Sequence, residues 1–285
     1  MNVSREKTIA IVTSASDAAG VSIKAQLLKN YGFEEVKGQK FDGFEVYSLP
    51  IEDYDARLFT TATDSIRCEN VDRQIAADLF VFATRHRSKA GVPALTAHAI
   101  GNWGKAEFGG KDSAICPTSP WLLKLFIQNL AAVAKSENYQ GEVVQESTHH
   151  GPYIEKPTVF IEIGSSEQQW KDAQLASMVA DSLIGGLGDY VTLDEHKEEH
   201  ELVLGIGGPH YARDFTKLTL GSKYAVGHIC PKHHLALLTP ELLQCALDAY
   251  LPKAAAVVVD WKGLGTEKQR IKQLLEGRKI KYFKV

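Results

Sequence analysis

Short apolar runs that resemble buried strands alternate along this chain with segments of helical periodicity, and this alternation restricts the fold more than any other feature. The runs KTIAIVT (residues 7–13) and DLFVFAT (residues 78–84) are typical of strands that are buried on both faces. Residues 120–135 instead place Leu122, Phe126 and Leu130 on one side of a helix. Strands alternating with helices predict an α/β protein, specifically a three-layer α/β/α sandwich around a mixed, largely parallel sheet.

The expected elements cover most of the chain. We predict strands at residues 7–13, 41–47, 57–61, 78–84, 142–148, 158–163, 201–206, 224–229, 254–260 and 279–283. A helix capped by Asp17 should extend to about residue 30, and further helices are predicted at residues 120–135, 166–187, 240–250 and 267–276. Residues 91–110 are predicted to form an irregular loop. Because no repeat or linker interrupts the pattern, we expect a single domain over residues 1–285.

Composition excludes several classes of protein. The 285 residues carry a formal net charge of −3, which argues against a protein that coats DNA or RNA over its whole surface. No signal peptide and no run of about 18 apolar residues is found, so we expect a cytoplasmic protein with no membrane and no DNA as partner. The four cysteines are far apart and are expected to be reduced thiols. With no heptad pattern and no obvious apolar patch, we expect a monomer.

Six of the ten histidines lie in short stretches punctuated by glycine or proline. These stretches are residues 84–104, 146–152, 205–212 and 227–231. Histidine is the side chain best suited to proton transfer at neutral pH and is a common zinc ligand, and glycine and proline mark the turns where sites are displayed. The pattern therefore indicates a hydrolytic enzyme with a metal bound by histidine.

The stretch ESTHHGP is the most suggestive of these clusters. If a strand runs to residue 150, alternation places Glu146, Thr148 and His150 on one face and His149 on the other. The following Gly-Pro stop could instead free both histidines from alternation. A carboxylate beside an imidazole is either a pair of metal ligands or a base with its orienting acid. Glu162, placed between isoleucines in a predicted strand, must point either at such a site or into water, because burying it alone is costly.

Other polar residues follow predicted strands or turns. Arg85, His86 and Arg87 come directly after an apolar strand, where ligands gather in open α/β sheets. The run GNWG places Asn102 and Trp103 in a turn that could face a substrate. The last twenty residues hold seven basic and two acidic side chains, which suits either a polyanionic partner or a solvated terminal helix. No HExxH, GxSxG, Walker A or GxGxxG motif is present.

Together, the segments TRHRSKAGVPALTAHAIGNWGKAEFGGKD, ESTHHGP, FIEIGSSEQQW, LGIGGPHYA, GHICPK and VVDWKG resemble the D-aminoacyl-tRNA deacylases of the archaeal and plant type. The likeness runs in order from about Ile9 to Lys281. It implies hydrolysis of the ester between a D-amino acid and the terminal ribose of tRNA. It also implies dependence on zinc and a fold similar to that of peptidyl-tRNA hydrolase and the nucleoside phosphorylases.

Residue types and positions suggest a division of roles within such a site. Zinc suits ester hydrolysis, because it lowers the pKa of its bound water and polarises a carbonyl. We predict that one or two zinc ions are bound by His86, His150, Glu162 and His210. Proton transfer is assigned to His98, Glu146 and His149. Contacts with the 3′-terminal nucleotides of tRNA are assigned to Arg85, Arg87, Asn102, Trp103 and Lys105.

Three other functions remain open on the sequence. A metal-free hydrolase could act through a His–Glu pair on the same tRNA esters. A nucleoside phosphorylase is the rival enzyme suggested by the fold. A tRNA-binding module without catalysis could use the basic carboxy terminus.

Overall fold

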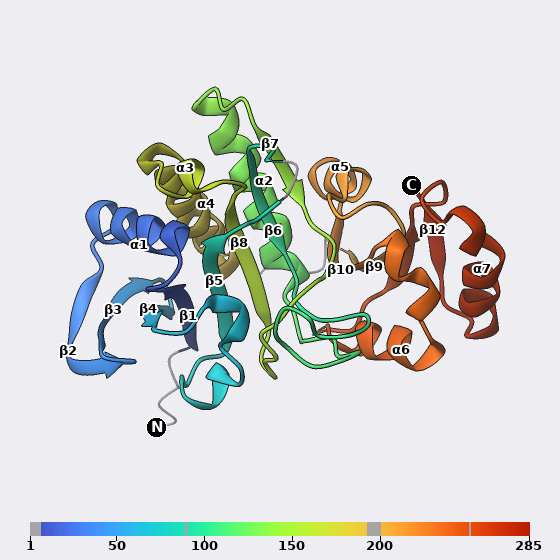
Figure 1. Cartoon of the computed structure of the whole chain (residues 1–285), viewed down its shortest axis with the longest axis horizontal. Helices are drawn as coiled ribbons and strands as arrows, with labels where there is room; N and C mark the ends of the chain where they lie inside the picture. Colours follow the sequence, from blue (N-terminus) through green and yellow to red (C-terminus); the bar gives the residue numbers. More distant parts are fainter. Residues whose placement is uncertain (1–6, 89–90, 193–200, 251) are drawn as a thin grey trace.

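The computed structural model describes residues 7–88, 91–192, 201–250 and 252–285, and it contains two β-sheets (Figure 1). The large sheet has the strand order β2-β3-β4-β1-β5-β8-β6-β7. Strands β4, β1, β5 and β8 run parallel to one another. Strand β6 is antiparallel to β8, and β2, β3 and β4 form an antiparallel meander. Its strands are β1 (Lys7–Ser14), β2 (Glu34–Phe41), β3 (Phe44–Ile51), β4 (Tyr54–Thr61), β5 (Leu79–Arg85), β6 (Ala94–His98), β7 (Glu142–Gln145) and β8 (Thr158–Gly164).

The small sheet is built from the last third of the chain. Its strand order is β10-β9-β11-β12, and each pair of neighbours is parallel. All four strands therefore end at one edge, where open parallel sheets place their ligand-binding loops. The strands are β9 (Glu201–Ile206), β10 (Tyr224–Cys230), β11 (Ala256–Val259) and β12 (Tyr282–Lys284).

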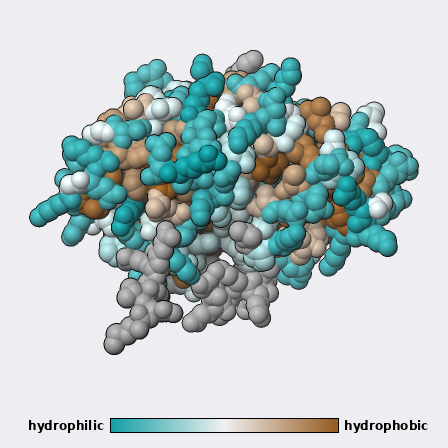
Figure 2. Space-filling model, turned by 90° about the horizontal axis from the view of Figure 1, so that it is seen from below, coloured by the Kyte–Doolittle hydropathy of each residue, from teal (hydrophilic) through white to brown (hydrophobic). Residues whose placement is uncertain are grey.

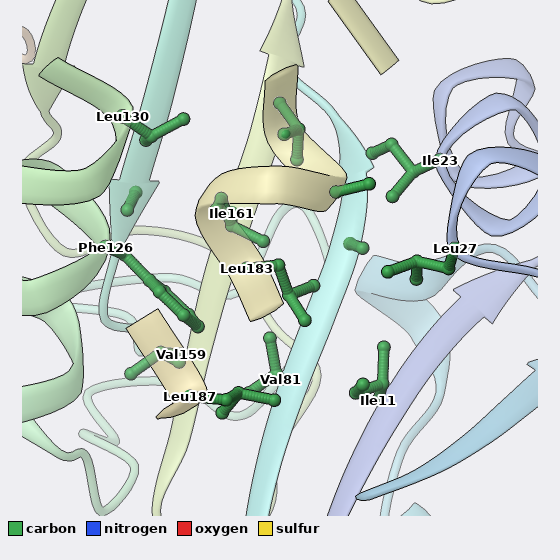
Figure 3. Close-up of a cluster of buried hydrophobic side chains, with 14 of the residues drawn as sticks. Ile11, Ile23, Leu27, Val81, Phe126, Leu130, Val159, Ile161, Leu183 and Leu187 are labelled. Carbon is green, nitrogen blue, oxygen red and sulfur yellow. The ribbon is translucent and has the colours of Figure 1, made fainter. Parts of the chain in front are cut away.

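Helices cover one face of the large sheet. Ile11, Val81, Val159 and Ile161 from the strands pack against apolar side chains of three helices, which Figure 3 shows in close-up. These helices are α1 (Ala18–Asn30), α2 (Pro120–Ser136) and α4 (Ala173–Thr192), with the short α3 (Glu167–Trp170) beside them. The side chains that they contribute include Ile23, Leu27, Phe126, Leu130, Leu183 and Leu187.

The opposite face of the large sheet has a different cover. Phe80, Phe82 and Phe160 pack there against the 3₁₀ turn η2 (Val71–Arg73) and against loop residues such as Ile100 and Ile154. The 3₁₀ turn η1 (Ser65–Arg67) precedes η2 in this region. On this face loops therefore take the place of helices, and polar side chains of the sheet can meet other parts of the chain.

The small sheet has helices on both faces. Helices α6 (Pro240–Asp248) and α7 (Lys268–Gly277), with the 3₁₀ turns η5 (Lys232–Leu237) and η6 (Gly265–Glu267), lie around one core. Helix α5 (Arg213–Gly221) covers the other face through Phe215. The predicted α/β class, with a mixed, largely parallel sheet and flanking helices, is confirmed. The two sheets have separate cores, and the single domain stays a prediction.

Local signals explain where several helices begin. Asp17 caps α1 by accepting hydrogen bonds from the amides of Ala19 and Gly20, as predicted. Ser119 does the same for α2, whose first residue is a proline. The long helix predicted at residues 166–187 is wrong in one respect. It breaks after α3 because Asp172 caps a new helix through the amides of Gln174 and Leu175.

Three further predictions need correction. The strand predicted at residues 41–47 spans a hairpin turn, because Asp42 and Gly43 take positive φ and separate β2 from β3. The loop predicted at residues 91–110 contains β6, a five-residue strand that pairs with β7 and β8. Helix α5 lies where no helix was predicted; it is nine residues long, and no side chain caps its N-terminus. The strand predicted at residues 142–148 stops at Gln145.

Within the described part of the chain, no helix is both long enough and apolar enough to span a membrane. Figure 2 shows the molecule from below, with hydrophilic residues over most of the visible surface and hydrophobic ones gathered in smaller areas between them.

Candidate active site

A row of polar side chains crosses the middle of the large sheet. In β8, alternate residues Val159, Ile161 and Ile163 enter the helix-covered core, so Glu162 points to the opposite face. Glu162 lies in register with Thr84 on one side and Thr96 on the other. Its side chain is almost fully buried, which a carboxylate tolerates only beside compensating partners.

His86 supplies one of these partners. It follows β5 and is fixed by a hydrogen bond from its amide to the carbonyl of Ile163. Its Nδ1 lies 3.0 Å from Oε1 of Glu146 and 3.4 Å from Oε2 of Glu162. Its Nε2 is 2.8 Å from the hydroxyl of Tyr211. His86 is therefore held between two carboxylates on one side and a phenol on the other.

Glu146 is the centre of the constellation. It follows β7 directly and bridges to Tyr211, which follows β9 of the small sheet. Its Oε2 lies 2.7 Å from Nε2 of His210 and 3.7 Å from Nε2 of His149. The side chain is completely buried, and although imidazole nitrogens lie close to both of its oxygens, neither oxygen accepts a well-aligned hydrogen bond from the described residues. Buried oxygens of this kind are expected around a bound cation or a proton-transfer path.

Three further imidazoles lie against this centre. The ring of His149 is 4.3 Å from that of His98, 4.3 Å from that of His150 and 4.4 Å from that of His210, measured between centroids. His98 is the last residue of β6 and is completely buried. His149 and His150 come from the loop after Glu146, where His150 takes a positive φ. That turn ends the strand-like alternation, so both histidines reach the same cluster.

Backbone carbonyls orient these three rings in the same way. Nδ1 of His98 is 3.1 Å from the carbonyl of Ala99, and Nδ1 of His149 is 2.8 Å from that of Ser147. Nδ1 of His150 lies 2.6 Å from the carbonyl of Gly151. A carbonyl only accepts, so each Nδ1 carries a hydrogen. Burial and nearby imidazoles lower the pKa of His149 and of His150, so these two rings keep a lone pair on Nε2, whereas Nε2 of His98 faces Glu162, which outweighs burial and raises the pKa of His98. This is how proteins prepare histidines to bind a metal through Nε2.

The distances define two groups of potential ligands. His98, His149 and His150 form one, and His86, Glu146 and His210 form the other, with the ligand atoms of each group within 4.8 Å of one another. Glu162 belongs to neither, but its Oε1 lies 3.5 Å from Nε2 of His98 while its Oε2 faces His86. The grouping differs from our prediction, which placed His150 and Glu162 with His86 and His210 as ligands.

The charges of the cluster follow from these neighbours. Burial alone would raise the pKa of Glu146, but the imidazoles of His210 and His86 hold that pKa well below its usual range. Burial likewise opposes ionisation of His86, yet Glu146 and Glu162 outweigh it and raise its pKa. The pKa of His149 is lowered by burial and by the surrounding imidazoles. An ionised, buried carboxylate thus lies beside a neutral imidazole.

The predicted tRNA contacts lie in different settings. Arg85 is half-buried and forms a 2.5 Å ion pair with Asp64, while its guanidinium lies over the ring of Trp170. Arg87 and Lys105 are exposed. The structure thus leaves Arg87 and Lys105 accessible to a polyanion and gives Arg85 a structural partner.

Asn102 and Trp103 have structural surroundings. Trp103 is fully buried in the core of the small sheet, and its indole N–H donates to the carbonyl of Ile229. Asn102 donates to the carbonyls of Gly109 and Lys111 and so pins a loop. Our prediction that Trp103 faces a substrate is therefore not consistent with its burial, which reflects the apolar area that an indole contributes to a core.

Sequence reasoning missed Tyr211 and Ser147. Tyr211 contacts His86, and Ser147 Oγ lies 3.3 Å from Nδ1 of His210. Both are neighbours of predicted residues, and this adjacency was the available signal. His228, by contrast, lies outside the cluster, where it contacts Thr148 and the carbonyl of Cys116.

Known proteins resemble this chain over most of its length. A sequence profile of the family described as D-aminoacyl-tRNA deacylase matches residues 73–283. The D-aminoacyl-tRNA deacylase of Pyrococcus horikoshii is 36% identical over 282 residues, covering 96% of this chain and 98% of that protein. The Archaeoglobus fulgidus protein of the same name is 33% identical over 266 residues, covering 92% and 90%.

Among solved structures, a conserved protein of unknown function superimposes with a TM-score of 0.83 at 29% identity, covering 98% of this chain and 95% of the other. The profile match and the identity over nearly full length agree on one family. This chain belongs to the D-aminoacyl-tRNA deacylase family.

Proposed function

We propose that this chain hydrolyses the ester between a D-amino acid and the terminal ribose of tRNA, releasing free D-amino acid and tRNA. The names of its relatives support the substrate. The observation that carries the chemistry is the buried Glu146 carboxylate, which lies among the imidazoles of His86, His149 and His210. Such a substrate occurs where translation takes place, in agreement with the predicted cytoplasmic location.

Zinc fits the residues present. His98, His149 and His150 each direct Nε2 away from an orienting carbonyl, and the lowered pKa values of His149 and His150 keep the Nε2 of these two rings unprotonated. Nε2 of His98 makes no well-aligned hydrogen bond to the described residues. We assign these three nitrogens to one zinc ion. When bound there, zinc would supply Lewis acidity toward the ester carbonyl and toward water. The group of His86, Glu146 and His210 would hold a second ion, if one binds.

The chain's own residues can handle the protons. His149 and His210, with 25% and 38% of their side chains exposed, form the accessible side of the cluster, so the ester approaches there. The ionised Glu146 accepts a proton from the attacking water as the water oxygen bonds to the ester carbon. The carbon–oxygen bond to the ribose then breaks, and the ribose oxygen receives the proton that Glu146 took from the water, passed on through His210, whose Nε2 lies 2.7 Å from Oε2 of Glu146. Glu162 keeps the rings of His86 and His98 in place.

The test compares D-tyrosyl-tRNA and L-tyrosyl-tRNA as substrates of the purified protein, with chelator and with zinc restored. Loss of the D ester alone, abolished by chelation and recovered with zinc, is the expected result. Hydrolysis of the D ester alone that survives chelation would support the deacylase activity and contradict the assignment of zinc. No hydrolysis of either ester with zinc present would overturn the proposal.

A further inference from the structure

Phe108 is the most exposed large hydrophobic side chain in the described part of the chain, with 62% of its surface open to solvent. Single exposed apolar residues are ordinary on protein surfaces. Phe108 differs because of its position in the loop that follows Trp103, where the exposed side chains of Lys105, Glu107, Lys111 and Asp112 surround it in sequence. Lys111 lies over the ring of Tyr153, so Lys105 is the cation that remains for a ligand. An exposed aromatic ring near a cation is an arrangement with which proteins bind single-stranded nucleic acid.

The loop that carries Phe108 is fixed by hydrogen bonds. The Asn102 amide donates to the carbonyl of Gly109 at 2.9 Å, and the amide of Gly110 donates to the Glu69 carboxylate at 2.6 Å. Gly109 and Gly110 both take positive φ. The loop therefore holds Phe108 in a fixed backbone, with most of its ring open to solvent.

The same loop is tied to the candidate active site. The carbonyl of Phe108 accepts a hydrogen bond of 3.0 Å from the amide of Gly151, the residue after His150. Phe108 thus lies one residue from a member of the imidazole cluster. In an aminoacylated tRNA the ester and the terminal base are attached to the same ribose. The base must therefore rest beside the cluster, within the width of one sugar.

We propose that Phe108 is the stacking platform for the nucleobase of the 3′-terminal nucleotide of tRNA, and that Lys105 faces the phosphate of that nucleotide. This assignment rests on the proposed ester hydrolysis and adds the subsite that holds the base. Because every base has a π-face, the platform recognises a base without reading its identity. The amino acid can then be selected independently, in the pocket next to the histidines.

The experiment uses two small esters, D-tyrosyl adenosine and D-tyrosyl methyl riboside, which lacks the base. Wild type should hydrolyse the adenosine ester with the lower KM. Phe108→Ala should raise that KM about 5- to 150-fold, the equivalent of about 1–3 kcal/mol of stacking, with kcat and the riboside KM unchanged. Phe108→Trp should keep the preference for adenosine, and Phe108→Leu, with bulk but no aromatic face, should lose most of it.

Leu220→Ala is the matched control, because Leu220 is also an exposed apolar residue (41%) and lies at the end of α5. It should leave both KM values unchanged. If wild type hydrolyses neither ester nor D-tyrosyl-tRNA, the proposed function fails. Two results would refute the platform while the function stands. In the first, wild type is active but Phe108→Ala keeps the lower KM for the adenosine ester. In the second, Phe108→Ala and Phe108→Leu raise the KM for both esters equally.

Discussion

Nε2 of His210 lies 2.7 Å from Oε2 of Glu146, although His210 follows a strand of the small sheet and Glu146 follows a strand of the large one. The contact therefore exists only when the two sheets are packed together. Tyr211 adds a second tie, through its backbone bridge to Glu146 and its hydroxyl contact with His86. The site is assembled by the docking of the two sheets, so its chemistry depends on residues that set this docking.

Replacing the central carboxylate should abolish turnover without unfolding the protein. Glu146→Gln keeps the shape of the side chain and removes its charge, so we expect kcat on D-tyrosyl-tRNA to fall about 10²- to 10⁴-fold, the range for loss of a general base. Glu142→Gln, four residues earlier in an exposed ion pair with Arg213, is the control and should retain full activity. Activity within tenfold of wild type for Glu146→Gln would exclude Glu146 as the base.

The three-histidine group should determine the zinc content. His150→Ala removes one of three Nε2 ligands, so after stripping and reconstitution the variant should retain markedly less metal than wild type. His233→Ala alters an exposed histidine outside both groups and should retain the wild-type amount. Atomic absorption on desalted protein gives the metal per chain. Equal zinc content in the two variants would contradict the three-histidine site and assign the ion to His86, Glu146 and His210.

Part of the site could be predicted because it depends on local pattern. Glu162 between two isoleucines in a strand must either be exposed or find partners, and His86 directly follows a buried strand. These features follow from period-two alternation and from the ends of parallel strands. Strand β6 escaped prediction because ALTAH is short and has weak β-propensity, so that only its pairing with β7 and β8 makes it a strand.

The grouping of the ligands could not be predicted, because it depends on contacts distant in sequence. Strict alternation would separate His149 from His150; the alternative left open, that the following Gly-Pro stop frees both, is correct, and the positive φ of His150 brings the two rings together. The contact of Glu146 with His210 requires the packing of two sheets. Burial was equally hidden for Trp103, since its sequence neighbours are turn residues and its contacts come from the core of the small sheet.

Lys124 should be essential for stability. It is a buried residue of α2 whose ammonium donates to the carbonyls of Thr219, Ser222 and Tyr224, at the end of α5 and the start of β10. Lys124→Met leaves these carbonyls without their donor, so we expect a loss of about 2–4 kcal/mol in the free energy of unfolding. Urea denaturation measures it. Lys135→Met, at the exposed end of the same helix, is the control and should change stability by less than about 0.5 kcal/mol.

Acid should destabilise the fold through His228. Its Nε2–H donates to the carbonyl of Cys116 at 2.9 Å, and its Nδ1 accepts from the hydroxyl of Thr148, which itself accepts from the amide of Ile229. A second proton on Nδ1 would break this chain. Burial lowers the pKa of His228 to about 3, while the carbonyl of Cys116 opposes this only weakly.

The folded pKa of His228 thus lies below its unfolded value of about 6.5. The unfolded chain takes up the proton first, so the stabilisation is complete above pH 6.5 and is lost as the pH falls toward 3. Each pH unit in this window should cost about 1.4 kcal/mol of unfolding free energy for this one group.

Urea denaturation of metal-free protein at pH 7.5 and 5.5 should show this loss of stability. In His228→Gln, the unfolding free energy should fall less steeply with pH, by the equivalent of up to one bound proton. His233→Gln, an exposed neighbour, should keep the wild-type slope. Identical slopes for wild type and His228→Gln would mean that His228 is already protonated in the folded protein.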